Sequence, residues 1–101
     1  MRRGTTPTIW VSLPFDLEEV EDIWLTVSQR SREILTKSKA DMHVEDEVRR
    51  VSWKLTQRET LKLEEGCKAL IQVRVLTTNG EAFATNEARV PVEGILKEGV
   101  I

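Results

Sequence analysis

Alternating apolar and polar positions are the strongest pattern along this chain. Two segments carry it, residues 68–77 and the second half of residues 47–55. The apolar positions of the two segments, in that order, are Ala69, Ile71, Val73 and Val75, and then Val51, Trp53 and Leu55. A repeat of two residues is typical of a strand with one buried face, so both segments predict strands. The polar face of the second segment, with Arg50, Ser52 and Lys54, favours an antiparallel sheet with one wet side.

Shorter runs of β-branched and aromatic residues predict further strands between polar turns. We expect them at residues 8–13, 22–28, 33–38, 81–85 and 88–92. The pair Asn79-Gly80 predicts a hairpin between the strands on either side of it. A loop of about four residues is expected between the strands at 22–28 and 33–38, and a bulge or kink near Asn86.

Three segments do not follow the plain strand pattern, and two of them have alternative interpretations. Residues 16–21 favour a turn before the strand at 22–28, but a helix over 16–28 competes with this interpretation. Residues 42–46 fit either a short strand or a loop. Thr56 and Glu59 have the spacing of a capping box, and Gly66 suits the left-handed position after a helical turn. One or two turns of helix are therefore expected between residues 56 and 66.

These elements predict an all-β fold with about six to eight short strands and one short helical turn. We expect an immunoglobulin-like antiparallel β-sandwich, in architecture only, because the Cys–Trp–Cys spacing of antibody domains is missing. The length of 101 residues fits one domain spanning residues 1–101.

Charge, hydrophobic run length and cysteine content limit the classes of partner and the compartment that we expect. The formal net charge of −2 supplies no broad attraction for nucleic acid. No apolar run approaches the ~20 residues of a membrane span, and no signal peptide is visible, so we expect neither a nucleic-acid nor a membrane partner. One cysteine, Cys67, cannot form an intrachain disulfide, which fits a protein made and folded in the cytoplasm.

Candidate chemistry is sparse. The single histidine, His43, lies among carboxylates but has too few companions for a zinc site. Cys67 would need His43 as its base to act as a nucleophile. No phosphate-binding glycine loop or serine-hydrolase motif is present. We therefore expect no catalytic residue, no metal and no cofactor.

Apolar residues that the core does not require are candidates for contacts with a partner. Trp53 alternates with buried positions and is expected in the core, whereas two other tryptophans and the apolar tail at 93–101 are less easily buried. We expect the tail to dock on the body or on a neighbouring subunit. The candidate interface residues are Trp10, Trp24, Ile95, Leu96, Val100 and Ile101.

Several short sequence segments, taken in order along the chain, resemble those of a known group of proteins. They are residues 3–8 (RGTTPT), 13–16 (LPFD), 55–63 (LTQRETLKL), 71–80 (IQVRVLTTNG) and 96–101 (LKEGVI). The chain resembles short uncharacterised prophage-encoded proteins of Gram-positive gut bacteria, nearly end to end. This resemblance implies a small β-sandwich part of a phage particle, of the tail or baseplate type, made in the bacterial host and carried in the virion.

Three functions follow as hypotheses. The first is a non-enzymatic phage structural or assembly module that contacts other phage structural proteins and self-associates. The alternative is a carbohydrate- or surface-binding module that uses exposed tryptophans. The third is a small enzyme that uses Cys67 and His43.

Overall fold

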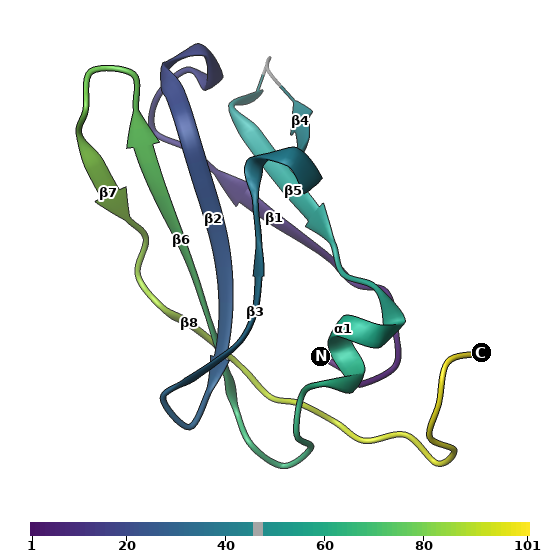
Figure 1. Ribbon diagram of the computed structural model, residues 1–101. Coiled ribbons are helices and arrows are strands. Elements are labelled where there is room, and N and C mark those ends of the chain that lie inside the picture. The colour runs from purple at the N-terminus through teal and green to yellow at the C-terminus, as the bar shows by residue number, and fades with distance from the viewer. Residues whose placement is uncertain (46–47) are drawn as a thin grey trace.

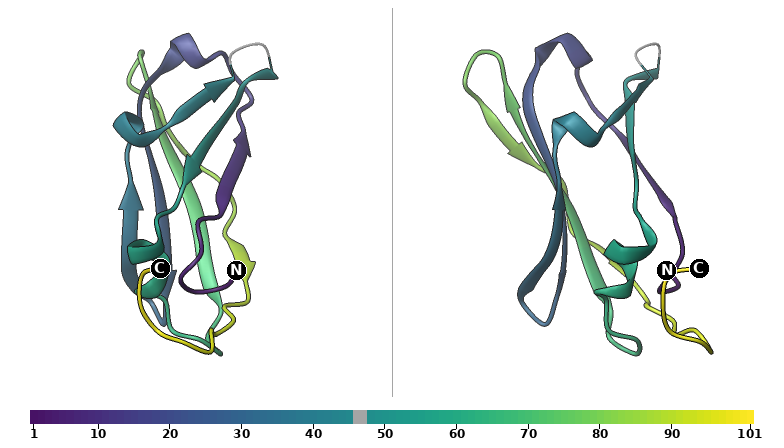
Figure 2. Two further views of the ribbon diagram at one scale, coloured as in Figure 1. Left: turned by 90° about the vertical axis from the view of Figure 1, so that its right-hand side faces the viewer. Right: turned by 45° about the vertical axis from the view of Figure 1, so that its right-hand side comes forward.

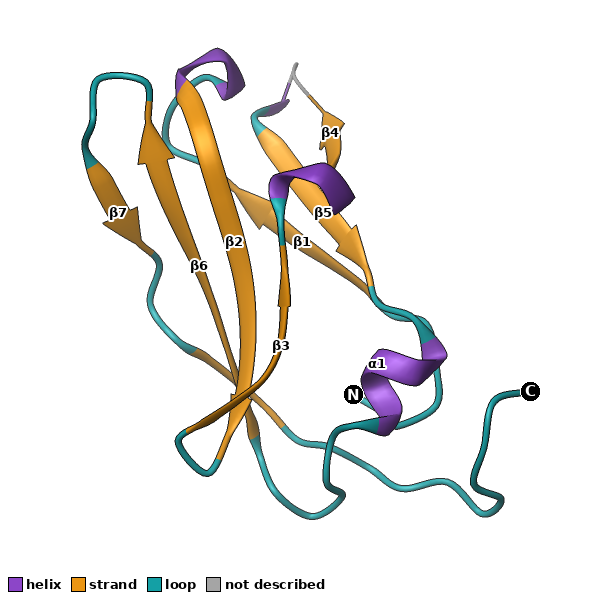
Figure 3. Ribbon diagram, viewed as in Figure 1, coloured by secondary structure: helices purple, strands orange, loops and turns teal. Residues whose placement is uncertain are grey.

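The computed structural model describes residues 1–45 and 48–101, and in this part of the chain the strands form two antiparallel sheets (Figures 1 and 3). The smaller sheet has the order β1-β5-β4, and the larger has the order β3-β2-β6-β7, with β8 also paired to β6. The strand bounds are β1 Thr8–Ser12, β2 Val20–Gln29, β3 Arg32–Lys37, β4 His43–Glu45, β5 Arg50–Lys54, β6 Ala69–Thr77, β7 Ala82–Ala84 and β8 Ala88–Val90. The helical turns are η1 Leu17–Glu19, η2 Lys39–Asp41 and α1 Gln57–Leu61.

The strand order is that of an immunoglobulin-like sandwich, which confirms the expected fold class. In that architecture one sheet carries strands B, E and D and the other carries C′, C, F and G. Here β1-β5-β4 takes the first order, and β3-β2-β6 with the broken pair β7 and β8 takes the second. Arg2 adds a parallel bridge to Glu93 beyond β8. The two layers face each other across the core (Figure 2).

The core lies between the sheets and follows the alternation in the sequence. Its members from β2, β5 and β6, with the residue after β5, are Ile23, Leu25, Val27, Val51, Trp53, Leu55, Ala69, Ile71, Val73 and Val75. Trp53 is fully buried, and its indole N–H donates to the carbonyl oxygen of Ser38 at 2.9 Å. The expectation that Trp53 belongs to the core is confirmed. An indole this deep needs such a partner, because an unpaired buried N–H costs about 1–3 kcal/mol.

The segment at 16–28 is a short turn followed by a strand, so the helix alternative is wrong. β2 pairs with β3 on one side and with β6 on the other. Its inward residues Ile23, Leu25 and Val27 repeat every second position, which fits a strand and not one helical face. The doubtful segment at 42–46 contains β4, a strand of three residues, while Asp46 lies outside the described residues.

The loop between β2 and β3 is shorter than expected. Only Arg30 and Ser31 separate the strands, with φ of 52° and 63°. Positive φ at both central residues defines a type I′ turn, whose twist matches that of paired strands. The predicted loop of about four residues was too long, because neither Arg nor Ser belongs to the usual signature of this turn.

The expected helical turn is confirmed as α1, and Thr56 caps it. The Thr56 hydroxyl accepts from the N–H of Glu59 at 3.1 Å, and the Glu59 carboxylate accepts from the N–H of Thr56 at 2.8 Å. Lys37 of β3 donates to the same carboxylate at 3.0 Å. Burial opposes ionisation of Glu59, but the hydrogen bonds from Thr56 and Lys37 outweigh it and lower the pKa of Glu59.

The hairpin at Asn79-Gly80 is also confirmed. Gly80 has φ of 86°, and Thr77 and Glu81 close the turn through their backbones. The kink expected near Asn86 separates β7 from β8. There the hydroxyl of Thr85 accepts from the N–H of Val73 at 3.0 Å and so replaces a missing ladder bond.

Candidate functional site

Trp10 and Trp24 lie on the outer faces of opposite sheets, and each is 48% exposed. Their neighbours in the chain explain this placement. Ile9 and Val11 point towards the core, so Trp10 between them points away from it. Ile23 and Leu25 impose the same outward direction on Trp24.

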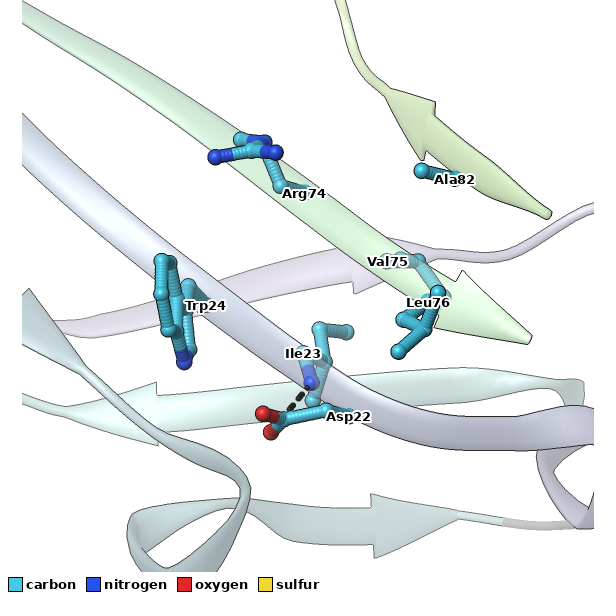
Figure 4. Close-up of a pocket in the computed structure, with 7 residues that line it drawn as sticks. All are labelled: Asp22, Ile23, Trp24, Arg74, Val75, Leu76 and Ala82. Atoms are coloured by element: carbon cyan, nitrogen blue, oxygen red, sulfur yellow. Dashed lines mark hydrogen bonds between the residues drawn. The ribbon is translucent and has the colours of Figure 1, made fainter. Parts of the chain in front are cut away.

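Trp24 forms one wall of a shallow cavity, which we call the Trp24 hollow. It has a volume of about 190 Å³, and its lining includes Trp24, Arg74, Asp22, Leu76 and Ala82. In Figure 4 the Trp24 ring stands up from β2, Leu76 lies across from it, and Arg74 and Asp22 lie on opposite sides. The hollow therefore has apolar walls and one charge of each sign at its rim.

Arg74 reaches Trp24 because the two residues are directly opposite each other in the β2–β6 register. Its guanidinium carbon lies 5.9 Å from the centre of the indole ring, at the outer range of a cation–π contact. Asp22 is held near the backbone, where its carboxylate accepts from the N–H of Ile23 at 2.9 Å. The register fixes both charged groups relative to the indole.

The Trp10 side repeats this arrangement on the smaller sheet. The guanidinium of Arg50 lies 4.5 Å from the centre of the Trp10 ring, and it also pairs with Glu45 at 2.8 Å. Ser52 lies opposite Trp10 on one side and opposite His43 on the other. Each outward indole is therefore accompanied by an arginine from the neighbouring strand.

The candidate residues of the tail do not form one surface with the tryptophans. Ile95 is half-buried and packs close to Gly4, so this part docks on the body. Leu96 and Ile101 project fully into solvent, and Val100 is 51% exposed. The backbone of Ile101 exchanges hydrogen bonds with the Gln57 side chain in α1. Ion pairs of Glu93 with Arg2 and of Glu98 with Arg3 also hold the tail on the body, while the side chains of Leu96, Val100 and Ile101 remain exposed.

Cys67 and His43 are not brought together. His43 begins β4, whereas Cys67 precedes β6 at the other end of the sandwich (Figure 1). Among the residues that the structure describes, no group of three or more His, Cys, Asp or Glu side chains is placed to hold a metal ion. Within residues 1–45 and 48–101, no helix has the length and apolar content needed to cross a bilayer.

Sequence reasoning selected the two outward tryptophans but missed their arginines. Arg50 belongs to the polar face that alternates with Val51 and Trp53, so the sequence could have predicted that its side chain points outward. The position of Arg74 beside Trp24 depends on the pairing of β2 with β6, which are far apart in the sequence.

Comparisons with known proteins leave this geometry as the main guide to function. No protein-family model, no curated protein and no solved structure matches the chain. The class that the structure defines is an immunoglobulin-like β-sandwich with a half-exposed tryptophan on each outer face.

Proposed function

We propose that the protein is a non-enzymatic structural or assembly module that binds another protein at the Trp24 hollow. The observation that carries this proposal is a half-exposed Trp24 beside Arg74, around an apolar depression. Tryptophan and arginine are the residue types most enriched where interfaces concentrate their binding energy. An apolar side chain of a partner would fill the hollow and exclude water from the indole.

The charges at the rim add direction to such a contact. Arg74 offers a planar donor and Asp22 an acceptor on opposite sides of the hollow. A partner that presents an apolar residue flanked by an acid and a base would satisfy both. Rim charges of this kind orient a complex more than they tighten it.

The sequence resemblance supports a biological setting for this contact. It favours other phage structural proteins as partners, in a particle assembled in the cytoplasm of a bacterial host. In this setting the protein is a virion component of the tail or baseplate type, and its fold alone would not distinguish that role from others.

The experiment compares phage particles from strains that carry the wild-type gene or a Trp24→Lys variant. Particles are purified after prophage induction, and the protein is quantified by mass spectrometry. Thr36→Lys is the matched control, because Thr36 is exposed on the same sheet face but does not line the hollow. We expect wild-type and Thr36→Lys protein in a fixed ratio to the particle and Trp24→Lys protein to be lost. Absence of the wild-type protein from the particles would refute the virion role, and equal incorporation of Trp24→Lys would refute the surface.

A second candidate is a carbohydrate- or surface-binding module, favoured by the exposed indoles with polar groups beside them. Sugars stack on a bare aromatic face, whereas Arg50 lies over the ring of Trp10 and Arg74 lies near that of Trp24. A glycan would have to displace these arginines, which is why a protein partner is preferred. Titration of tryptophan fluorescence with host-wall glycans separates the two. A saturable change that disappears in Trp24→Phe or Trp10→Phe would favour the glycan.

A further inference from the structure

β1 is an edge strand with one free side. Only β5 pairs with it, and β1 forms the end of the smaller sheet. The carbonyl of Pro7 accepts from Leu55 and the N–H of Leu13 donates to Arg49, so odd-numbered residues of β1 bond to β5. In an antiparallel pair the intervening residues point their N–H and C=O groups the other way. Within the described part of the chain, the outward groups are those of the even-numbered residues Thr8, Trp10 and Ser12, and they have no partner.

A groove runs beside this free edge and opens the sandwich on that side. Its volume is about 610 Å³. Its lining includes Ile9 and Val11 of β1 and the buried residues Ile71 and Val73 of β6. The Figure 2 views show β1 at the margin of its sheet. An added strand would therefore gain main-chain hydrogen bonds and apolar contact together.

The edge also lacks the features that usually prevent pairing. Natural edge strands carry charges, prolines or bulges, or are very short. β3 has Arg32, Glu33 and Lys37, and β4 has three residues. β1 reads Thr-Ile-Trp-Val-Ser, without a charge, a proline or a break in its register with β5. At the other edge of the larger sheet, β7 and β8 have only three residues each and are separated by the kink near Asn86. Of the edges that the structure describes, β1 is the one prepared to accept a strand.

The sequence of β1 identifies that strand as a second copy of itself. Around Trp10 the order is hydroxyl, β-branched, Trp, β-branched, hydroxyl, so it has the same chemical character in both directions. We propose that β1 pairs antiparallel with β1 of a second copy, with Trp10 on the two-fold axis. Thr8 then bonds to Ser12 of the second copy through the outward groups of both. On the groove side, Ile9 lies opposite Val11 of the second copy.

This register agrees with the surrounding charges. No charged residue belongs to β1, so the pairing brings no like charges into opposition. Arg50 keeps its partner Glu45 and its place over Trp10. The two smaller sheets become one continuous sheet, and a C2 contact of this kind is closed and does not propagate.

The dimer goes beyond the contact at the Trp24 hollow and does not depend on it. Trp24 lies on the other sheet and stays exposed in both copies. A strand of five residues buries less than the ~1,600 Å² of a standard interface, so we expect a dimer that dissociates on dilution.

The first test is the solution mass of the full chain by light scattering across the micromolar range. Wild type should move from the monomer mass to twice that mass as concentration rises. Trp10→Lys should remain a monomer, because two lysines would meet at the axis and the aromatic pair would be lost. Trp24→Lys is the matched control, with the same substitution at the same exposed fraction, and should dimerise like wild type. A wild type that stays monomeric, or a Trp24→Lys that abolishes the dimer while Trp10→Lys does not, would overturn the proposal.

The second test reads the register and does not depend on the folding of Trp10→Lys. In a Cys67→Ser background, Thr8→Cys protein and Ser12→Cys protein are oxidised separately and as a mixture. The mixture should give disulfide-linked dimers, because these positions are opposite each other, and each protein alone should give few. Equal cross-linking in all three samples, or none in the mixture, would refute the antiparallel pairing about Trp10. Amide hydrogen exchange gives a further check on the partner of this edge. If the β1 amides are protected only when phage particles are added, the strand that pairs with β1 belongs to another protein, and the proposed dimer is refuted.

Discussion

Gln29 at the end of β2 allows a sharp test of what holds the loop between α1 and β6 in place. Its side chain is only 3% exposed. The amide nitrogen donates to the carbonyls of Glu64 and Cys67, both at 2.9 Å, and the amide oxygen accepts from the N–H of Glu64 at 2.8 Å. One amide thus satisfies three backbone groups between α1 and β6. Gln29→Met keeps the length of the side chain and removes all three bonds.

The expected loss of unfolding free energy in Gln29→Met follows from the backbone groups that the substitution leaves without hydrogen-bond partners. A buried donor or acceptor that loses its partner costs about 1–3 kcal/mol. Glu64 itself is exposed, so water can reach part of the loop and each cost should fall near the lower end. We expect a loss of about 2–4 kcal/mol from a total of ~5–15 kcal/mol. At about 4–8 °C per kcal/mol for a domain of this size, Tm should fall by about 8–32 °C.

The assay is urea unfolding followed by circular dichroism, with Gln72→Met as the control. Gln72 also donates from a strand to a carbonyl, that of Thr85 at 3.0 Å, but this single bond is exposed. Its loss should cost less than ~1 kcal/mol. If Gln29→Met unfolds within ~0.5 kcal/mol of wild type, or no earlier than Gln72→Met, the buried amide does not organise the loop.

Three further substitutions test the core, the cap and a turn. Trp53→Phe removes the indole bond to Ser38 and leaves space between the sheets, so urea unfolding should show a loss of about 2–3 kcal/mol. The depressed pKa of Glu59 means that its ionised form stabilises the fold above its ordinary pKa of 4.5, and this contribution disappears as pH falls through and below that value. Glu59→Gln should therefore be less stable than wild type at neutral pH and show a shallower loss of stability in acid titration; equal acid slopes would contradict this. Ser31→Gly should raise the free energy of unfolding by about 0.5–1 kcal/mol, because Ser31 has positive φ and a left-handed backbone costs a residue with a Cβ about 1–2 kcal/mol, more than the ~0.4–1 kcal/mol that glycine loses through its more flexible unfolded chain. No gain in urea unfolding would argue against strain at this position.

Local patterns predicted the local structure well. The alternation through Ala69, Ile71, Val73 and Val75 identified the buried face of β6, and these residues are buried. The Thr56–Glu59 spacing identified the cap of α1. Such signals work because the partners are a few residues apart, so no knowledge of the tertiary structure is needed.

Features that depend on distant pairing were not predictable in this way. The contact of Arg74 with Trp24 requires the β2–β6 register, and two strands with apolar alternation admit several registers. The free side of β1 requires the strand order of a whole sheet. The predicted length of the loop between β2 and β3 was wrong for a different reason. The extended pairing of these strands imposes positive φ on Arg30 and Ser31, a backbone conformation that neither residue favours.

The requirements of the fold account for Trp53 but not for the other two tryptophans. Trp53 fills the space between the sheets, whereas the outward positions near Trp24 on β2 carry hydroxyl residues such as Thr26 and Ser28. The same face of β1 has Thr8 and Ser12 on either side of Trp10. A sandwich therefore accepts small polar residues at these sites, and a half-exposed indole gains little from folding alone because much of its apolar area stays in water. The arginine beside each indole covers part of that area while the protein is free. The cost of exposing Trp10 and Trp24 is reduced but not removed, and this remaining cost is the reason that we propose a partner contact at each of them.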